Sequence, residues 1–584
     1  MAKRGVRLVL FLIVLAVIVS AAGMTLVFLA VGRQPSVARN STLVLKLDGD
    51  LHEVPTDGVV RQLLEGSGPS GLRAVLQNLQ RAKTDARVGA VLIVPTGLAA
   101  PLWAKVQEVH DAIVDFRKSG KPAIAFLEYA GEREYYIAAA CDRIFLTPTA
   151  TLDLNGLATY EVFLRGTLDR IGVYPDILHT GEYKTAFNAF TERGFTPAHR
   201  EMSDSLTRDL YDQLVERVAD SRGKTADDVR ALLDQGPFSS RQALEAGFVD
   251  ELAYVDQIDD RTPLPGGALR RLDADEYGRV GAGRFGLGGG PKIAVIYATG
   301  VIASGEGGYD PLMGAVLGSD RLNEYIRDAR GDTSIRAIVV RIDSPGGSAV
   351  ASDAIWRELV LTRDEKRDRP LVVSMSDLAA SGGYWIATAA PHIIAQPGTL
   401  TGSIGVITGK MVTGGLYEKL GANIESVSQG RHAEIASPAR PFTDSERARL
   451  AALMEDTYQA FLSKVAESRD MTVEEVTAIA QGRVWTGRQA ERIGLVDELG
   501  GLDRALAVAK ERAGIGADER VQVVVYPPRR SVYELISRGL AGEGASLPAL
   551  LPAEDRRLIG LFAAPALLAG AGEPLALMPA LTLR

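Results

Sequence analysis

Short apolar runs alternate with amphipathic stretches through most of the 584-residue chain. The runs at 293–296, 337–342 and 371–374 are rich in β-branched residues and have the length of buried strands. Between them, residues 352–362 space their apolar positions as a helix does. This alternation predicts α/β domains, each with a mostly parallel sheet that is covered by helices on both faces.

One apolar run is much longer than a strand. Residues 8–32 carry no charge, and the cations Lys3, Arg4 and Arg7 precede them. A helix of about 20 apolar residues spans a bilayer, whereas the apolar core of a secretory signal peptide is usually about 7–15 residues long. Cations ahead of the run favour a cytoplasmic N-terminus. We therefore expect residues 1–34 to form a transmembrane anchor in contact with lipid, with the bulk of the chain on the other side of the membrane.

The chain carries one pattern twice. Arg241-Gln242-Ala243 recurs as Arg488-Gln489-Ala490 after 247 residues, and Tyr135 recurs as Tyr384 after 249 residues. Agreement within two residues over such a span indicates a tandem duplication. The Pro- and Gly-rich segment 256–291 is typical of a linker. The expected parts are a first repeat at 41–255, a second repeat at 292–526 and an Ala/Leu/Pro-rich tail at 527–584.

Composition narrows the function classes. Hydrophobic residues make up 46% and charged residues 24% of the chain, as in ordinary globular proteins. A net charge of -8 argues against a nucleic-acid partner, which would normally require a basic surplus. The single cysteine, Cys141, excludes an intrachain disulfide, and with only six histidines a zinc centre is not expected. We expect neither a metal nor an organic cofactor.

Two glycine-flanked turns of the second repeat are candidates for chemistry. Residues 343–348, which include Gly346-Gly347, come directly after a predicted strand and directly before a predicted helix, so the glycine N–H groups could face an oxyanion at the helix N-terminus. An ordinary tight turn is the alternative. Ser381-Gly382-Gly383 follows another predicted strand. Ser381 is there either a nucleophile or the N-cap of a helix.

The two repeats differ at the candidate residues in a complementary way. The first repeat has Glu132 at the position of Ser381, and the second has Ala433 at the position of Lys184. One composite site, with Ser381 as nucleophile and Lys184 as general base, accounts for both differences. Lys184 must be neutral to accept a proton, so burial has to lower its pKa. Ser403, in a third turn, could orient the lysine amine or be an ordinary turn hydroxyl.

Together these motifs resemble the long form of signal peptide peptidase A, also called protease IV, a family of bacterial membrane-anchored serine proteases. The resemblance lies in residues 183–186, 343–347, 380–384 and 401–405, in the apolar N-terminal run and in the duplication. It implies tandem Clp-protease/crotonase-like repeats and a Ser/Lys dyad. It also implies a homotetramer on the periplasmic side of the inner membrane that degrades released signal peptides.

We therefore expect a membrane-bound serine endopeptidase that cleaves short apolar peptides through an acyl-enzyme. The N–H of Gly382, with that of Gly346 or Gly347, would hold the tetrahedral oxyanion. Two other functions stay open: a crotonase-like enzyme that acts on acyl-CoA without Ser381, and a non-catalytic membrane assembly protein. A histidine base, His392 or His432, is the alternative to lysine.

Overall fold

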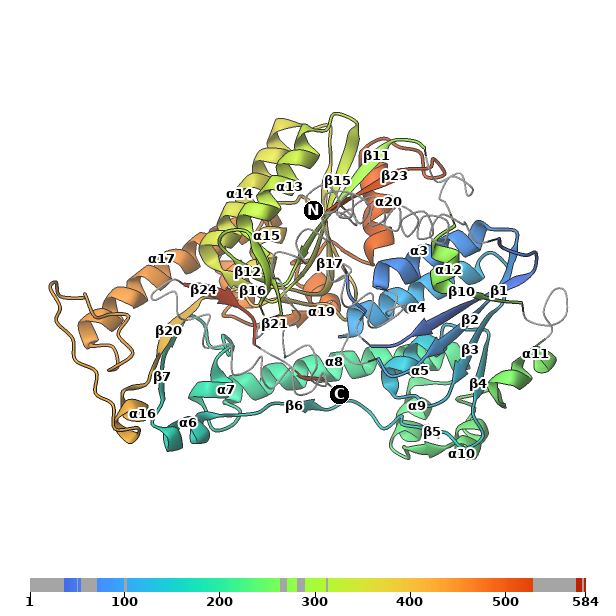
Figure 1. The fold of residues 1–584 in the computed structure, drawn as a ribbon, viewed down its shortest axis with the longest axis horizontal. Helices are drawn as coiled ribbons and strands as arrows, with labels where there is room; N and C mark the ends of the chain where they lie inside the picture. The colour runs from blue at the N-terminus through green and yellow to red at the C-terminus, as the bar shows by residue number, and fades with distance from the viewer. Residues whose placement is uncertain are drawn as a thin grey trace, which may run out of the picture.

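The computed structural model describes residues 36–49, 51–53, 71–98, 102–262, 270–280, 289–310, 314–528, 574–579 and 582–583 (Figure 1). The expected anchor at 8–32 lies outside these ranges. Within them, no helix combines the length and the apolar character needed to cross a membrane.

The first repeat is built on a parallel sheet, at the right of Figure 1. Its described strands follow the order β10-β1-β2-β3-β4-β9. Nearly every residue of the central strand β2 is buried, as expected for a strand that is covered on both faces. The strands are β1 (Ser41–Leu47), β2 (Val88–Pro95), β3 (Ala123–Leu127), β4 (Arg143–Leu146), β9 (Glu251–Leu252) and β10 (Arg270–Asp273).

Helices cover the first sheet, and the 26-residue helix α8 extends beyond it (Figure 1). Thr196 caps α8 by accepting the N–H of His199, Pro197 occupies its first turn, and Gly223 ends it with φ 60°. The helices are α3 (Leu72–Thr84), α4 (Trp103–Arg117), α5 (Glu132–Ala138), α6 (Arg165–Ile171), α7 (Asn188–Thr191), α8 (Pro197–Arg222), α9 (Ala226–Leu233), α10 (Ser240–Glu245), α11 (Ile258–Arg261) and α12 (Ala274–Gly278).

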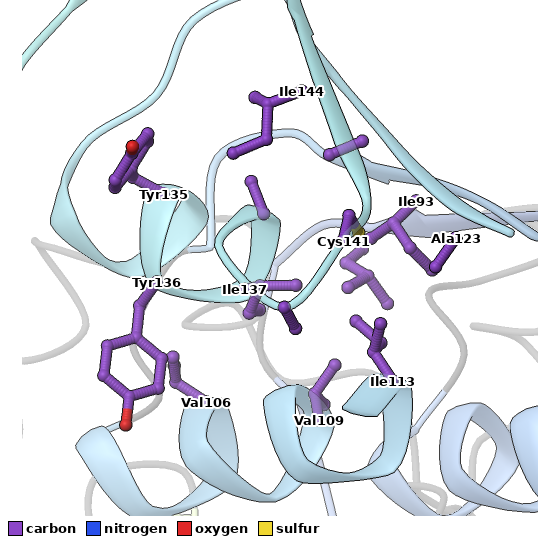
Figure 2. Packing of buried hydrophobic residues seen from close by; sticks show 14 of the residues in the cluster. Ile93, Val106, Val109, Ile113, Ala123, Tyr135, Tyr136, Ile137, Cys141 and Ile144 are labelled. Atoms are coloured by element: carbon purple, nitrogen blue, oxygen red, sulfur yellow. The ribbon is translucent and has the colours of Figure 1, made fainter. Parts of the chain in front are cut away.

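Part of the segment expected to be a linker belongs to this first domain. Residues 270–273 form β10, which pairs in parallel with β1 from Ser41↔Arg270 to Val44↔Asp273. The domain core also holds the single cysteine. Figure 2 shows Cys141 among Ile93, Ile113 and neighbouring apolar side chains. Burial raises the pKa of the Cys141 thiol, so it remains a protonated core residue.

The second repeat has an equivalent sheet, in the upper centre of Figure 1. Its described strands run β21-β19-β17-β15-β11-β23, and β18 joins β17 to β22. The predicted apolar runs lie in β11, β15 and β17. The strands are β11 (Lys292–Thr299), β15 (Ile335–Ser344), β17 (Leu371–Ala380), β18 (Ile393–Ala395), β19 (Leu400–Gly402), β21 (Val484–Thr486), β22 (Glu498–Leu499) and β23 (Gln522–Tyr526).

The helices of the second repeat include the one expected around 352–362, which is α14. They are α13 (Ser319–Gly331), α14 (Ala349–Glu365), α15 (Gly382–Ala387), α16 (Gly414–Lys419), α17 (Asp444–Arg469), α18 (Val473–Ile479), α19 (Gly487–Arg492) and α20 (Leu502–Arg512). Corresponding contacts recur in both repeats. The Tyr135 hydroxyl donates to the Phe248 carbonyl at 2.7 Å, and the Tyr384 hydroxyl donates to the Leu495 carbonyl at 2.8 Å. The duplication is therefore present in the fold.

A third sheet joins the two repeats and the tail. In the described residues its order is β13-β14-β12-β16-β24-β20-β7. The first repeat supplies β7, which pairs antiparallel with β20 from Ile407↔His179 to Val412↔Tyr174, and the tail supplies β24. The strands are β7 (Tyr174–His179), β12 (Val301–Ala303), β13 (Gly307–Asp310), β14 (Gly314–Gly318), β16 (Gly346–Ser348), β20 (Ile407–Val412) and β24 (Leu575–Leu577).

The turn of residues 343–348 lies between the end of a strand and the start of a helix, as expected. The two glycines form β16, and α14 begins only at Ala349, where the Ser348 hydroxyl accepts the N–H of Ala351. Glycine is required at these two positions because β16 lies between β12 and β24, whose backbones leave no room for a Cβ. Gly346 and Gly347 have φ values of 99° and 154°, and a Cβ on Gly347 would come within 2.1 Å of the Ile302 carbonyl oxygen.

Candidate active site

The structure brings the predicted serine and lysine together within one chain. Lys184 lies between β7 and α7, and Ser381 lies between β17 and α15. The distance from Lys184 Nζ to Ser381 Oγ is 2.8 Å. Both side chains are buried, with 1% and 0% exposure. The composite arrangement that the complementary repeats suggested is thus formed across the junction of the two repeats.

Ser403 completes the surroundings of the lysine amine. Lys184 Nζ lies 2.9 Å from the Ser403 carbonyl oxygen and 3.0 Å from its Oγ. A neutral amine has two N–H groups and one lone pair. The two N–H groups can donate to Ser403 while the lone pair accepts the hydroxyl proton of Ser381. A neutral lysine can therefore make all three contacts.

Burial favours that neutral form. It lowers the pKa of Lys184 well below the ordinary value for a lysine. The cause is desolvation of the ammonium, because a charged group loses its hydration when it is buried. Phe187 and Phe190, which follow Lys184 closely in the chain, lie in a buried apolar cluster with Ile407.

The segment Gln481-Gly482, which packs against Lys184, was not predicted from the sequence. The N–H of Tyr183 donates to the Gln481 carbonyl at 2.8 Å. A Cβ on Gly482 would come within 2.6 Å of Lys184 Cα, so only glycine allows this close approach. The signal was present in the repeat, because Gln481-Gly482 corresponds to Gln235-Gly236 in the first half.

Ser381 and Ser403 both have an unfavourable backbone conformation. Their φ values are 56° and 49°, in the region that favours glycine. Such conformations cost about 1–3 kcal/mol each and are common at functional sites. Hydrogen bonds hold them, from the Ser381 N–H to the Gly402 carbonyl and from the Ser403 N–H to the Arg483 carbonyl, both at 2.7 Å. Ser381 occupies the N-cap position of α15, but its side chain makes no capping hydrogen bond there.

The three glycines proposed as oxyanion donors, Gly346, Gly347 and Gly382, differ in the partners of their backbone N–H groups. The Gly346 N–H donates to Ser344 Oγ at 3.2 Å, so it is already used. Gly347 lies in β16 beside the position filled by β24. Gly382 is the first residue of α15, directly after Ser381. Of the two alternatives that the sequence left open, the geometry favours Gly347 over Gly346 as the partner of Gly382.

The other candidate residues, His392, His432 and Glu132, make contacts outside the Lys184–Ser381 site. His392 contacts Glu498 and Arg512, and His432 contacts Ser445. Glu132, at the position of Ser381, accepts the N–H groups of Asn155 and Gly156 at 3.0 and 3.1 Å. Within the described ranges, no group of three or more His, Cys, Asp or Glu residues is arranged to hold a metal ion.

Comparisons with known proteins match both repeats of the chain. Peptidase family S49 matches residues 115–263 and 363–516, one segment in each repeat. The chain is 36% identical over 517 residues to the chloroplastic serine protease SPPA of Arabidopsis thaliana, which covers 86% of this chain and 74% of that protein. It is 30% identical over 542 residues to protease 4 of Salmonella typhi, with 89% and 85% coverage.

One solved structure with some similarity is a mutant of the 1510-N membrane-bound stomatin-specific protease in complex with a substrate peptide. It shares 17% identity and a TM-score of 0.24, over 43% of this chain and 98% of that one. The two matched segments and the long alignments confirm the family resemblance seen in the motifs. The chain belongs to peptidase family S49, as a tandem-repeat serine peptidase related to signal peptide peptidase A and protease IV.

Proposed function

We propose that the chain is a membrane-anchored serine endopeptidase in which Ser381 is the nucleophile and Lys184 the general base. The observation that carries this proposal is the 2.8 Å contact between Lys184 Nζ and Ser381 Oγ in a fully buried site. The substrates are signal peptides and other short apolar peptides. The repeats have the Clp-protease/crotonase-like fold, and the active form is a homotetramer on the periplasmic side of a bacterial inner membrane.

The reaction follows from the groups present. Neutral Lys184 takes the proton of Ser381 as Oγ attacks the peptide carbonyl. The N–H groups of Gly347 and Gly382 stabilise the oxyanion, and the loss of one such donor typically costs about 2.7–4 kcal/mol in the transition state. The Lys184 ammonium then gives its proton to the leaving amine. Water hydrolyses the Ser381 ester with Lys184 again as base.

The position between β16 and β20 supports a peptide substrate. The two strands face each other across the place of a single strand, which β24 fills here. An extended peptide can pair with such exposed strand edges through its main chain, while its side chains enter alternate pockets. The buried apolar cluster of Phe187, Phe190 and Ile407 lies on one side of that place, which favours apolar side chains in the substrate.

The replacement Ser381→Ala tests the proposal. It removes one buried oxygen and no packing group, so we expect peptide cleavage to fall to background while the thermal midpoint and oligomeric state stay those of the parent. A fluorophosphonate should label the parent chain and leave the variant unlabelled. A crotonase-like enzyme would instead keep its turnover of acyl-CoA in the variant, and an assembly protein would cleave no peptide in either form.

A further inference from the structure

A short segment of the chain's own tail fills the strand position beside the dyad. Residues 574–579 pair antiparallel with β16, from Ser348↔Leu575 to Gly346↔Leu577. The Met578 N–H donates to the Pro345 carbonyl at 2.9 Å, and the Ala349 N–H donates to the Pro574 carbonyl at 3.3 Å. On its other edge β24 pairs with β20. The segment therefore completes the third sheet between its two halves (Figure 1).

The register between β24 and β16 places Ala576 opposite Gly347. In an antiparallel ladder, hydrogen-bonded pairs alternate with pairs that are not bonded. The bonds at both ends of β24 make Gly347 and Ala576 a hydrogen-bonded pair, so the Gly347 N–H faces the Ala576 carbonyl. A Cβ on Gly346 would lie 2.0 Å from that carbonyl oxygen, and one on Gly382 would lie 3.3 Å from it. The carbonyl of Ala576 thus lies against the proposed oxyanion donors.

The side chains of the segment are held as those of a bound peptide would be. Leu575 and Leu577 are buried on one face, in the cluster that contains Phe187, Phe190 and Ile407. Met578 is buried on the other face, in the cluster that contains Met202, Leu206, Ala380 and Leu400. Large apolar side chains flank a small one at the residue nearest the glycines. The three large side chains are thus each held among apolar neighbours, with the small side chain of Ala576 between Leu575 and Leu577.

A second contact retains the end of the chain. Residues 582–583 form β25, which pairs antiparallel with β6 (Thr159–Tyr160) of the first repeat. The tail is thus paired with both repeats on either side of residues 580–581. Because the segment is part of the same chain, its effective concentration at the strand position exceeds that of a free peptide at ordinary dilution.

We propose that residues 574–579 are an intrachain, substrate-like occupant of the peptide-binding position, with Ala576 in the place of the residue whose carbonyl Ser381 attacks. The docked tail blocks peptide access, and the enzyme takes substrates only when the tail leaves. The interpretation of this position as the substrate site rests on the proposed function. A free peptide competes with the tail, so its apparent affinity falls in proportion to the fraction of molecules in which the position is open.

The test uses the full chain and a change that expels the tail. Leu577→Asp would bury a carboxylate in the apolar cluster, so we expect the segment to undock. Val427→Asp is the matched control, because the side chain of Val427 is fully exposed. Both changes are made in a Ser381→Ala background, so that binding is measured without turnover. The probe is a fluorescein-labelled peptide with the sequence of residues 574–579.

If the tail is docked in about nine molecules of ten, Leu577→Asp should tighten binding of the probe about tenfold, while Val427→Asp should leave it unchanged. A chain that ends at residue 573 should bind as tightly as the Leu577→Asp variant, and it introduces no buried charge. Equal affinity in the parent, the Leu577→Asp variant and the shortened chain would overturn the proposal.

Activity assays separate this proposal from the proposed function. In chains that retain Ser381, Leu577→Asp should raise kcat/KM for a short apolar peptide by the same factor and leave kcat unchanged. If no chain cleaves peptides but the tail variants still bind the probe more tightly, the proposed function fails and the occupancy stands. If the parent cleaves peptides and the tail variants neither bind nor cleave better, only the occupancy fails.

Discussion

At the scale of the residue, the decisive feature of Lys184 is that its partners carry no negative charge. Its amine contacts the hydroxyls of Ser381 and Ser403 and one carbonyl oxygen. A buried lysine beside a carboxylate would be held as an ammonium and could not act as a base. With burial alone acting on it, the pKa of Lys184 falls well below that of an ordinary lysine, which favours the neutral amine that a general base requires.

The first prediction is a pH dependence of peptide cleavage. Below the lowered pKa of Lys184 the amine is protonated and cannot accept the serine proton. Cleavage should therefore rise with pH through that pKa and level off above it. Lys184→Arg should be inactive at every accessible pH, because a guanidinium stays charged to above about pH 12. The measurement is kcat/KM as a function of pH.

Lys121→Arg is the matched control for this profile. Burial lowers the pKa of Lys121 as well, but its amine donates to the carbonyl groups of Ala82 and Asp85 in the first repeat. This variant should keep the parent's rate and profile. If Lys184→Arg also kept them, Lys184 would not be the base, and a profile that rises near the histidine pKa of about 6.5 would point to an imidazole instead.

The residues of the proposed dyad could be singled out from the sequence because the duplication provides an internal comparison. Lys184 has no lysine counterpart and Ser381 no serine counterpart in the other repeat, whereas the scaffold around both is kept. The choice between Gly346 and Gly347 could not be made in this way. It depends on the Ser344 hydroxyl, which takes up the Gly346 N–H only in the folded turn.

At the scale of the element, α4 of the first repeat holds two strands of the second. Lys105 Nζ lies 2.7 Å from Asp343 and 3.4 Å from Asp377. Asp343 is near the end of β15, just before the glycine turn, and Asp377 is in β17, four residues before Ser381. Asp377 also accepts the N–H groups of Leu102 and Lys105 at the start of α4. Burial alone would lower the pKa of Lys105, but Asp343 and Asp377 raise it, so the amine stays charged.

The second prediction concerns this lysine as a positioning residue. Lys105→Met leaves two buried carboxylates without their cation, so the ends of β15 and β17 should shift relative to each other. We expect kcat to fall at least about tenfold, equivalent to ~1.4 kcal/mol in the transition state, with little change in KM. Adding Asp343→Asn should restore most of the rate, because one charge is removed while the amide oxygen can still accept the Leu378 N–H.

A purely structural role for Lys105 would give another result. The thermal midpoint would then fall in the single variant, while kcat per folded molecule would remain that of the parent. Equal kcat in the parent and in Lys105→Met, measured below the midpoint of both, would contradict the positioning role.

Elements that depend on distant partners are those that the sequence did not predict. The apolar runs of β11, β15 and β17 are long enough to be recognised locally. β24 has only three residues, and its sequence Leu-Ala-Leu is also compatible with a helix. Its strand conformation comes from pairing with β16 and β20, more than 160 residues earlier in the chain. In the same way, β10 forms a strand within a Pro/Gly-rich region because it pairs with its distant partner β1.

At the scale of the whole molecule, a buried charge cluster couples the repeats. Arg341 of the second repeat lies 2.7 Å from Glu53 and 2.5 Å from Glu108, which both belong to the first. The Arg341 side chain has no exposed surface. Burial favours the neutral form of both acids, but the Arg341 guanidinium holds the pKa of Glu53 below its usual value. The pKa of Glu108 stays raised. These ion pairs exist only while the two repeats remain docked, because their partners lie in different repeats.

The final prediction is that this cluster determines whether the repeats unfold together. Arg341→Met leaves the buried carboxylates of Glu53 and Glu108 without the guanidinium that they contact, and the removal of one partner from a buried ion pair typically costs about 3–5 kcal/mol. We expect the urea midpoint of the full chain to fall accordingly and the two repeats to unfold in separate steps.

A triple variant distinguishes unpaired charge from lost packing. Glu53→Gln and Glu108→Gln, added to Arg341→Met, remove the buried charges and retain nearly the same side-chain volumes. Because replacing a whole buried cluster by neutral groups is often close to neutral in stability, this chain should regain most of the lost midpoint and unfold in one step. If the triple variant were as unstable as Arg341→Met alone, the packing of the Arg341 side chain, and not its charge, would join the two repeats.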